Sequence, residues 1–431
     1  MTLIIRLQAA LLGVLVWVGG LLFLPLYVTD PFEYPKAMAF IVVIGLLTIL
    51  TLAHAISSER SVSWKSLPLE VKLLFGVIAA QFLAFVFSTN SSISLLGAPF
   101  RFQGLIAQLT LAVYFLNVVY IFRYFRPSDS RKTFFIWLVG AGVVSALVSL
   151  TPFVVDYPFF DLEGFQNRVF GALGNPNYLA VYLTGIIPFL GLFFSHKSWW
   201  IRVVSVAALL LLLAVLFLTG SRSAWLSLVL GLFFVSILVV LKQKSWRMLV
   251  MILSVVVLLV GVFLFQRFYE TDLLHRFSLT KDNVGSVSTR GYLQEAGLKL
   301  FLERPVFGTG QEMVIDHIEP YLPEYLKSND IFYIDRTHNE FLDVLVMQGL
   351  VGFLAYILFW GILLWRACKY YLQSSGESAF LFSIAAIVII HLNYAMNFAV
   401  VSANILLYLF AGYVVALRNQ AEKIANKNEI L

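Results

Sequence analysis

The chain has 431 residues, of which 60% are hydrophobic and only 13% are charged. Soluble globular domains are about one-quarter charged, so this composition excludes an ordinary soluble protein. Membrane proteins are enriched in lysine and arginine on their cytoplasmic side, and this enrichment accounts for the formal net charge of +6. The charge therefore gives no reason to invoke a nucleic acid partner. The sequence predicts an all-α polytopic integral membrane protein, organised as a single membrane domain over residues 1–431.

Apolar runs of about 20 residues recur along the chain, and about 20 helical residues are needed to cross a hydrocarbon core of roughly 30 Å. The sixth and eleventh runs are short and could be tilted, broken or partly interfacial. The runs predict about twelve transmembrane helices, at residues 7–28, 36–56, 69–89, 103–122, 133–154, 177–194, 200–219, 223–241, 248–266, 342–365, 378–393 and 395–416.

Charge predicts the orientation of these spans. If the N-terminus lies on the cytoplasmic side, the segments on that side contain 18 of the 30 Lys and Arg residues and 6 of the 24 Asp and Glu residues. Lysine and arginine are enriched in cytoplasmic segments of membrane proteins. We therefore expect both chain termini to be cytoplasmic.

Cationic residues occur where the first predicted spans meet the outer face. Lys36 ends the segment DPFEYPK before the second span, and Arg101 lies in GAPFRFQG before the fourth. Arg168 precedes GALGNPNYLA, in which Asn175 is a predicted N-cap and Pro176 fits the first helical position. Helix N-termini attract anions, because their backbone N–H groups are free and their partial charge is positive.

Arg222 is the clearest of these cations, because it lies at the tip of the two-span hairpin LTGSRSAWLSLVLG. Arginine is costly near lipid, so a membrane-level arginine usually faces a cavity or a partner. Guanidinium groups also match phosphate oxygens in pairs. We therefore expect an outward-facing site for a phosphate-bearing, lipid-linked substrate.

One predicted outer connection, residues 267–341 between the ninth and tenth spans, is long enough to have structure or function of its own. Within it, TRGYLQEAGLKLFLERPVFGTG predicts an amphipathic helix that begins at Thr289 or Arg290 and ends at Arg304-Pro305. This helix would lie on the membrane surface or cover a cavity. Its apolar stripe consists of Leu293, Ala296, Leu300 and Phe301, and Gly308 and Gly310 allow the turn that follows.

The same loop ends in DRTHNEFLDVLVMQGLVGF, residues 335–353. Thr337 and Glu340 have the spacing of a capping box, which would make His338 the first residue of the tenth span. Positive potential at a helix start, together with nearby arginines, disfavours the imidazolium form. A neutral imidazole can accept a proton from a hydroxyl group, so His338 is a candidate general base.

Simpler interpretations exist for each of these residues. An arginine at the end of a span can anchor the helix to lipid headgroups, and we assign Arg304 and Arg336 to that class. A histidine at a helix start is often a solvated cap residue.

Three segments in this order resemble the O-antigen ligase and polymerase superfamily of bacterial membrane glycosyltransferases: LTGSRSAWLSLVLG, TRGYLQEAGLKLFLERPVFGTG and THNEFLDVLVMQGLVGFLAYILF. DPFEYPK and FGALGNPNYLA are similar to weaker family elements. The resemblance implies a GT-C-like fold in the bacterial inner membrane, with the active site on the periplasmic or outer face.

The resemblance also implies a reaction. The family moves a glycan from undecaprenyl diphosphate to a hydroxyl acceptor, and its ligases invert the sugar without a metal or other cofactor. The acceptor could be lipid A core, a growing glycan, a wall polymer or a protein. The family's histidine and two arginines match His338, Arg222 and Arg290, and further donor-site candidates are Arg168, Arg101, Asn175, Asn177 and Lys36.

Other functions remain open from the sequence. A metal-dependent glycosyltransferase could use Asp30 and Glu33, or Glu270 and Asp272, because Mg²⁺ and Mn²⁺ prefer oxygen ligands. A transporter or flippase of lipid-linked sugars would place polar groups near the bilayer midplane, whereas the cations here gather at the outer ends of spans. A non-enzymatic scaffold leaves the gathered arginines unexplained.

Overall fold

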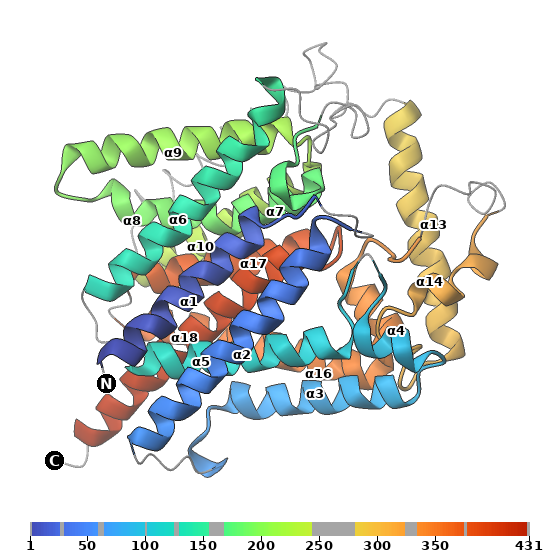
Figure 1. The fold of residues 1–431 in the computed structure, drawn as a ribbon, viewed down its shortest axis with the longest axis horizontal. Helices are drawn as coiled ribbons and strands as arrows, with labels where there is room; N and C mark the ends of the chain where they lie inside the picture. The colour runs from blue at the N-terminus through green and yellow to red at the C-terminus, as the bar shows by residue number, and fades with distance from the viewer. Residues whose placement is uncertain are drawn as a thin grey trace.

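The computed structural model describes residues 2–25, 30–58, 64–99, 101–124, 129–154, 168–243, 281–323, 334–374 and 377–428. The regular elements in these ranges are all helices, as the sequence predicts (Figure 1). They are α1 (Thr2–Leu21), α2 (Glu33–Ser57), α3 (Leu69–Val86), α4 (Ser91–Leu96), α5 (Leu105–Tyr124), α6 (Asp129–Ser149), α7 (Pro176–Ile186), α8 (Gly191–Phe194), α9 (Trp199–Leu218), α10 (Arg222–Gln243), α13 (Lys281–Glu303), α14 (Val314–His317), α16 (Glu340–Gln373), α17 (Ser378–Tyr394) and α18 (Val401–Asn428).

Ten helical segments in the described residues are long and apolar enough to cross a membrane. They correspond to the first eight, the tenth and the twelfth predicted spans. The eleventh is α17, a shorter apolar helix of 17 residues. The predicted ninth span, 248–266, lies outside the described residues. A polytopic membrane protein is therefore confirmed.

Helix α18 lies inside the bundle and is the most buried of the ten candidate spans. It packs against α5, α17 and α1. Helices α2 and α9 are the least buried, and apart from Ser57 and Arg202 near their ends their exposed side chains are apolar, as is typical of lipid-facing helices. The start of α1 and the end of α18 lie on one side of the molecule, and α13 and α14 lie on the opposite side (Figure 1).

The predicted loop helix is present as α13, but it begins at Lys281, before the predicted start. Its end at Glu303, just before Arg304 and Pro305, agrees with the prediction. Its apolar stripe does not lie on a membrane surface. Leu293, Ala296 and Leu300 are buried in a small second core with residues of α14 and α16. Helix α13 therefore covers the N-terminal end of α16.

Helix α16 is not continuous, because Gly349 has φ 63° and ψ −169°, which no helix contains. The segment 305–310, which begins with a turn, lies against this break, and Gly308 and Gly310 in it have positive φ. A break at membrane depth is tolerated when protein groups pair its backbone. Four hydrogen bonds do so here: Thr309 N–H to Val346 O, Gly310 N–H to Met347 O, Leu350 N–H to Pro305 O and Val351 N–H to Val306 O.

Gly349→Ala should destabilise the protein. An added Cβ would lie 2.3 Å from the carbonyl oxygen of Val306, and a non-glycine residue in such a backbone conformation costs about 1–3 kcal/mol. Gly361→Ala, in the same helix but with nothing within 4 Å of its added Cβ, is the matched control. Thermal unfolding in detergent should show a lower midpoint for the first variant alone. Equal midpoints would contradict the structural role of the break.

Candidate functional site

Six residues between α17 and α18, hereafter the 395–400 loop, join the elements that hold the predicted catalytic residues. The sequence predicts helix from residue 395, but α18 begins at Val401. The backbone carbonyl of Met396 accepts a hydrogen bond from Arg290 Nη1 at 3.2 Å. Asn397 Nδ2 donates to Ser223 Oγ at 2.7 Å, in the first turn of the Arg222 helix. The Phe398 ring lies 5.2 Å from the His338 ring, centroid to centroid.

His338 is not the first residue of α16, so the predicted capping box is wrong. Asn339 is the N-cap, and its side-chain oxygen accepts from the backbone N–H groups of Phe341 and Leu342. Glu340 does not turn back toward Thr337, because its carboxylate accepts from the N–H of Ala399 at 2.8 Å. His338 instead has φ 59°, a left-handed backbone conformation just before the helix begins.

The pKa of His338 is lowered from 6.5 to about 4. Burial is the largest cause, and the positive charges of Arg290 and Arg101 act in the same direction, against Asp335. The Nδ1 atom is buried without a hydrogen-bond partner among the described residues. The imidazole is therefore neutral near pH 7, as the sequence predicts, although burial rather than a helix end is the main reason.

Arg290 and Arg222 bring two positive charges together. The charge of Arg222 lowers the pKa of Arg290, after the larger effect of burial. Among the described residues, Arg290 donates to the carbonyl of Met396 and, at 3.5 Å, to the amide oxygen of Asn397. Neither arginine forms an ion pair with a carboxylate in this part of the chain. Two partly buried guanidinium groups in such a setting favour a nearby anion.

The other arginines near His338 are neutralised. Arg101 forms a two-point ion pair with Asp335 and lies with its guanidinium carbon 4.3 Å from the centre of the Phe398 ring. Arg101 keeps the pKa of Asp335 below its usual value, although burial raises it. Arg336 is 5% exposed and forms an ion pair with Glu312. Arg336 is thus a buried structural residue, and its assignment as a lipid anchor is wrong.

Arg168 and the two asparagines lie at the start of α7. Asn175 is the N-cap, as predicted, and its side chain accepts from the N–H of Asn177 at 2.8 Å. Asn177 in turn accepts from Arg168 Nη2 at 3.0 Å, and Arg168 Nε donates to the carbonyl of Thr219, three residues before Arg222. These residues hold the start of α7 against the hairpin that has Arg222 at its tip.

Lys36 is completely buried, and its ammonium group donates to the carbonyls of Phe32 and Ala172, both at 2.9 Å. Glu33 lies 3.7 Å from the same nitrogen. Two of the ammonium donors therefore have hydrogen-bond partners inside the protein, and the Glu33 carboxylate compensates the charge. This geometry does not support the predicted contact between Lys36 and a substrate.

The predicted metal ligands have other partners. Both carboxylate oxygens of Asp30 accept backbone N–H groups, from Phe32 and Glu33, and Glu33 lies beside Lys36. In the part of the chain that the structure describes, no group of three or more His, Cys, Asp or Glu side chains could hold a metal ion. Glu270 and Asp272 lie outside the described residues.

Neither Asn397 nor Asp335 is among the residues that the sequence predicts for the site. Asn397 contacts Arg290 and the first turn of the Arg222 helix, and Asp335 neutralises Arg101 beside His338. One signal was present: Asn393, Asn397 and Asn404 interrupt a long apolar stretch. Polar residues within membrane segments are often functional.

Residues 207–357 match the family model described as O-antigen ligase. This match includes Arg222, Arg290 and His338. The resemblance to the O-antigen ligase and polymerase superfamily is confirmed. The teichuronic acid biosynthesis protein TuaE of Bacillus subtilis (strain 168) is 26% identical to this chain over 206 residues, which are 46% of this chain and 40% of that protein. The alignment thus spans less than half of that relative's length.

The lowered pKa of His338 predicts a pH-dependent result. The ring should stay neutral between about pH 5 and 8, since its pKa of about 4 lies below that range. Arg290→Gln removes a positive charge that lowers this pKa, so the pKa should rise. Lys299→Gln removes an exposed charge on the same helix and should leave the pKa unchanged. NMR titration of labelled histidine rings, assigned with His338→Gln, measures the pKa; a wild-type value near 6.5 would refute the environment described here.

Asn397→Asp should weaken anion binding at the arginine pair. The new carboxylate would pair with Arg290 at nearly unchanged side-chain volume. A hydrogen bond to a charged group contributes about 1.5–3 kcal/mol, so pyrophosphate affinity should fall by roughly one order of magnitude. The control is Asn404→Asp on α18, which places a carboxylate beside Tyr394 of α17. Equal affinity for wild type and Asn397→Asp in calorimetry would show that the arginines do not form an anion site.

Proposed function

We propose that this protein is a glycosyltransferase that moves a glycan from an undecaprenyl-diphosphate carrier to a hydroxyl acceptor. The observation that supports this most strongly is the grouping of a neutral, buried imidazole with Arg290, and of Arg290 with Arg222. The imidazole of His338 can accept a proton, and the guanidinium groups of Arg290 and Arg222 can bind a diphosphate. The match of residues 207–357 to the O-antigen ligase family supports the same reaction.

In this proposal Arg222 and Arg290 bind the diphosphate of the donor. Their uncompensated charge favours a bound anion, and it stabilises the additional negative charge that develops on the diphosphate as it leaves. Arg168 is a further candidate for this contact, because its guanidinium lies beside the turn that precedes Arg222. The two arginines supply the charge compensation without a metal ion.

His338 is the proposed general base. The acceptor oxygen attacks the anomeric carbon of the donor sugar on the face opposite the diphosphate, and a new carbon–oxygen bond forms with inversion. The bond from that carbon to the phosphate oxygen breaks, and the diphosphate carrier leaves with the electron pair. The imidazole takes the proton of the attacking hydroxyl.

The Arg101–Asp335 pair is proposed to position His338 rather than to bind the donor. Asp335 lies three residues before His338, and Arg101 ties it to the α4–α5 connection. The Phe398 ring, which contacts both Arg101 and His338, completes the support. A base held on several sides keeps the geometry that a proton transfer requires.

We further propose that the site opens to the outer face of a bacterial inner membrane, with both termini in the cytoplasm. The excess of lysine and arginine in the predicted inner segments supports this orientation. A lipid-linked surface glycan is then the donor class, and a glycan or glycolipid such as lipid A core is the acceptor of a ligase. A growing glycan is the second candidate acceptor, because the Bacillus subtilis relative is named for teichuronic acid biosynthesis.

His338→Ala should reduce glycan transfer by roughly 10²–10⁴-fold, which is the usual contribution of a general base. Arg290→Lys should also be impaired, because an ammonium group cannot bind a phosphate at two points. The assay uses reconstituted protein, an undecaprenyl-diphosphate glycan and a panel of acceptors, with mass spectrometry of the products. Arg304→Lys is the control, since Arg304 is half-buried and, among the described residues, its side chain donates to the carbonyl of Phe87.

Substantial transfer by His338→Ala would refute its role as the base. Normal kinetics of Arg290→Lys would indicate a structural role for Arg290. Movement of labelled lipid-linked sugar across liposomes without any acceptor would favour a transporter over a transferase.

A further inference from the structure

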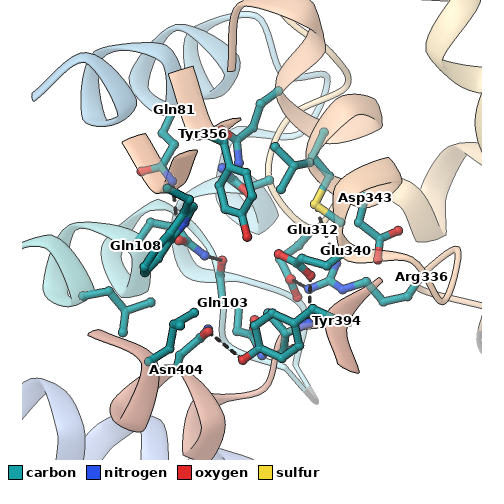
Figure 2. Close-up of a pocket in the computed structure, with 18 of the residues that line it drawn as sticks. Gln81, Gln103, Gln108, Glu312, Arg336, Glu340, Asp343, Tyr356, Tyr394 and Asn404 are labelled. Carbon is teal, nitrogen blue, oxygen red and sulfur yellow. Dashed lines mark hydrogen bonds and ion pairs between the residues drawn. The ribbon is translucent and has the colours of Figure 1, made fainter. Parts of the chain in front are cut away.

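A polar cavity lies beside Arg336 and Glu340, which stand two residues before and two residues after His338. Its walls come from α3, α5, α16 and α18, the residues that follow Gly310, Arg336, Tyr394 at the end of α17 and Ala399 of the 395–400 loop, and its volume is about 40 Å³. Figure 2 shows Gln81 and Gln108 on one side, Tyr394 and Asn404 on another, and Glu312 and Arg336 on a third. Neither His338, Arg222 nor Arg290 lines this cavity. It is therefore separate from the proposed catalytic site.

Four buried polar atoms of the cavity lining have no hydrogen-bond partner among the residues that the structure describes. Two are donors, the side-chain nitrogens of Gln311 and Trp360, and two are acceptors, Oδ2 of Asp343 and Oε1 of Gln348. These four side chains are between 1% and 5% exposed. An unpaired polar group in a protein interior costs about 1–3 kcal/mol, so a bound partner is expected at each atom.

The cavity's size and polarity restrict what can bind. A volume of about 40 Å³ is too small for a sugar ring, and the carboxylates of Glu312, Glu340 and Asp343 disfavour an anion. Two of the four unpaired atoms are N–H donors, which a metal cation cannot satisfy. The ligand must both donate and accept hydrogen bonds, and it must be small.

We propose that the cavity is a built-in water site that holds roughly three ordered water molecules, since each needs about 10–15 Å³. These waters pair Gln311 and Trp360 with Asp343 and Gln348. Asp343 binds Thr337, the residue before His338, and Gln348 directly precedes the break at Gly349. The waters thus join the His338 segment to the broken part of α16. This inference does not depend on the proposed reaction.

Hydroxyl-radical labelling of the intact protein in nanodiscs tests the proposal, because radiolysis of bound water labels the side chains beside it. Met347 and Trp360 line the cavity and are 5% and 4% exposed, whereas Met313 and Phe359 are 0% and 1% exposed and do not line it. We expect several-fold faster labelling of Met347 than of Met313, and of Trp360 than of Phe359 after correction for intrinsic reactivity. Labelling of all four at the same corrected rate would overturn the proposal.

The double variant Gln311→Leu and Gln348→Leu removes one unpaired donor and one unpaired acceptor. It should slow the labelling of Met347 and Trp360 severalfold while leaving Met313 and Phe359 unchanged; undiminished labelling would contradict a water site held by these amides. If this variant does not fold, the comparison of Met347 with Met313 and of Trp360 with Phe359 in the wild-type protein still tests the proposal. Replacement of Na⁺ by K⁺ or choline should leave wild-type labelling unchanged, and a dependence on the cation would indicate a bound ion instead.

Discussion

The main physical constraint on this structure is the cost of burying positively charged side chains. A cation buried in a protein is expensive unless a carboxylate compensates it. Four pairs follow this rule: Arg101 with Asp335, Arg336 with Glu312, Lys36 with Glu33, and Arg418 with Glu70. Arg222 and Arg290 are the contrast, because they lie near each other without a carboxylate partner among the described residues. Uncompensated charge next to a neutral base is what an enzyme acting on a diphosphate needs, which is why the proposed function centres on this pair.

Irregular backbone at membrane depth positions these residues. The 395–400 loop contacts Arg290, the Arg222 helix and the His338 ring, so one short segment sets the relation among all three. The break at Gly349 lets the segment 305–310 enter beside α16, and α13 covers the N-terminal end of the same helix. Non-helical backbone is tolerated in a membrane protein only where protein or water satisfies its polar groups. In both irregular segments protein groups pair backbone polar atoms, and the proposed waters beside the break would pair further polar atoms.

Much of the fold could be predicted from sequence because it follows from local chemistry. Apolar length predicted the spans, Asn175 capped its helix as expected, and the end of α13 before Pro305 matched. The failures concern groups that find distant partners. Thr337 and Glu340 have capping-box spacing, yet they bind Asp343 and the 395–400 loop instead. No spacing rule pairs Arg336 with Glu312 or buries Lys36, because the competing partners come from elsewhere in the chain. The three residues proposed for catalysis rest on family resemblance as well as on this geometry.

The most direct measurement is a structure of the protein bound to an undecaprenyl-diphosphate-linked sugar. The account predicts the diphosphate oxygens within hydrogen-bond distance of the guanidinium groups of both Arg222 and Arg290. It also predicts that the His338 ring faces the anomeric carbon from the side opposite the leaving group, across a gap that a hydroxyl acceptor fills. A diphosphate bound away from both arginines, or a sugar out of reach of His338, would contradict the account.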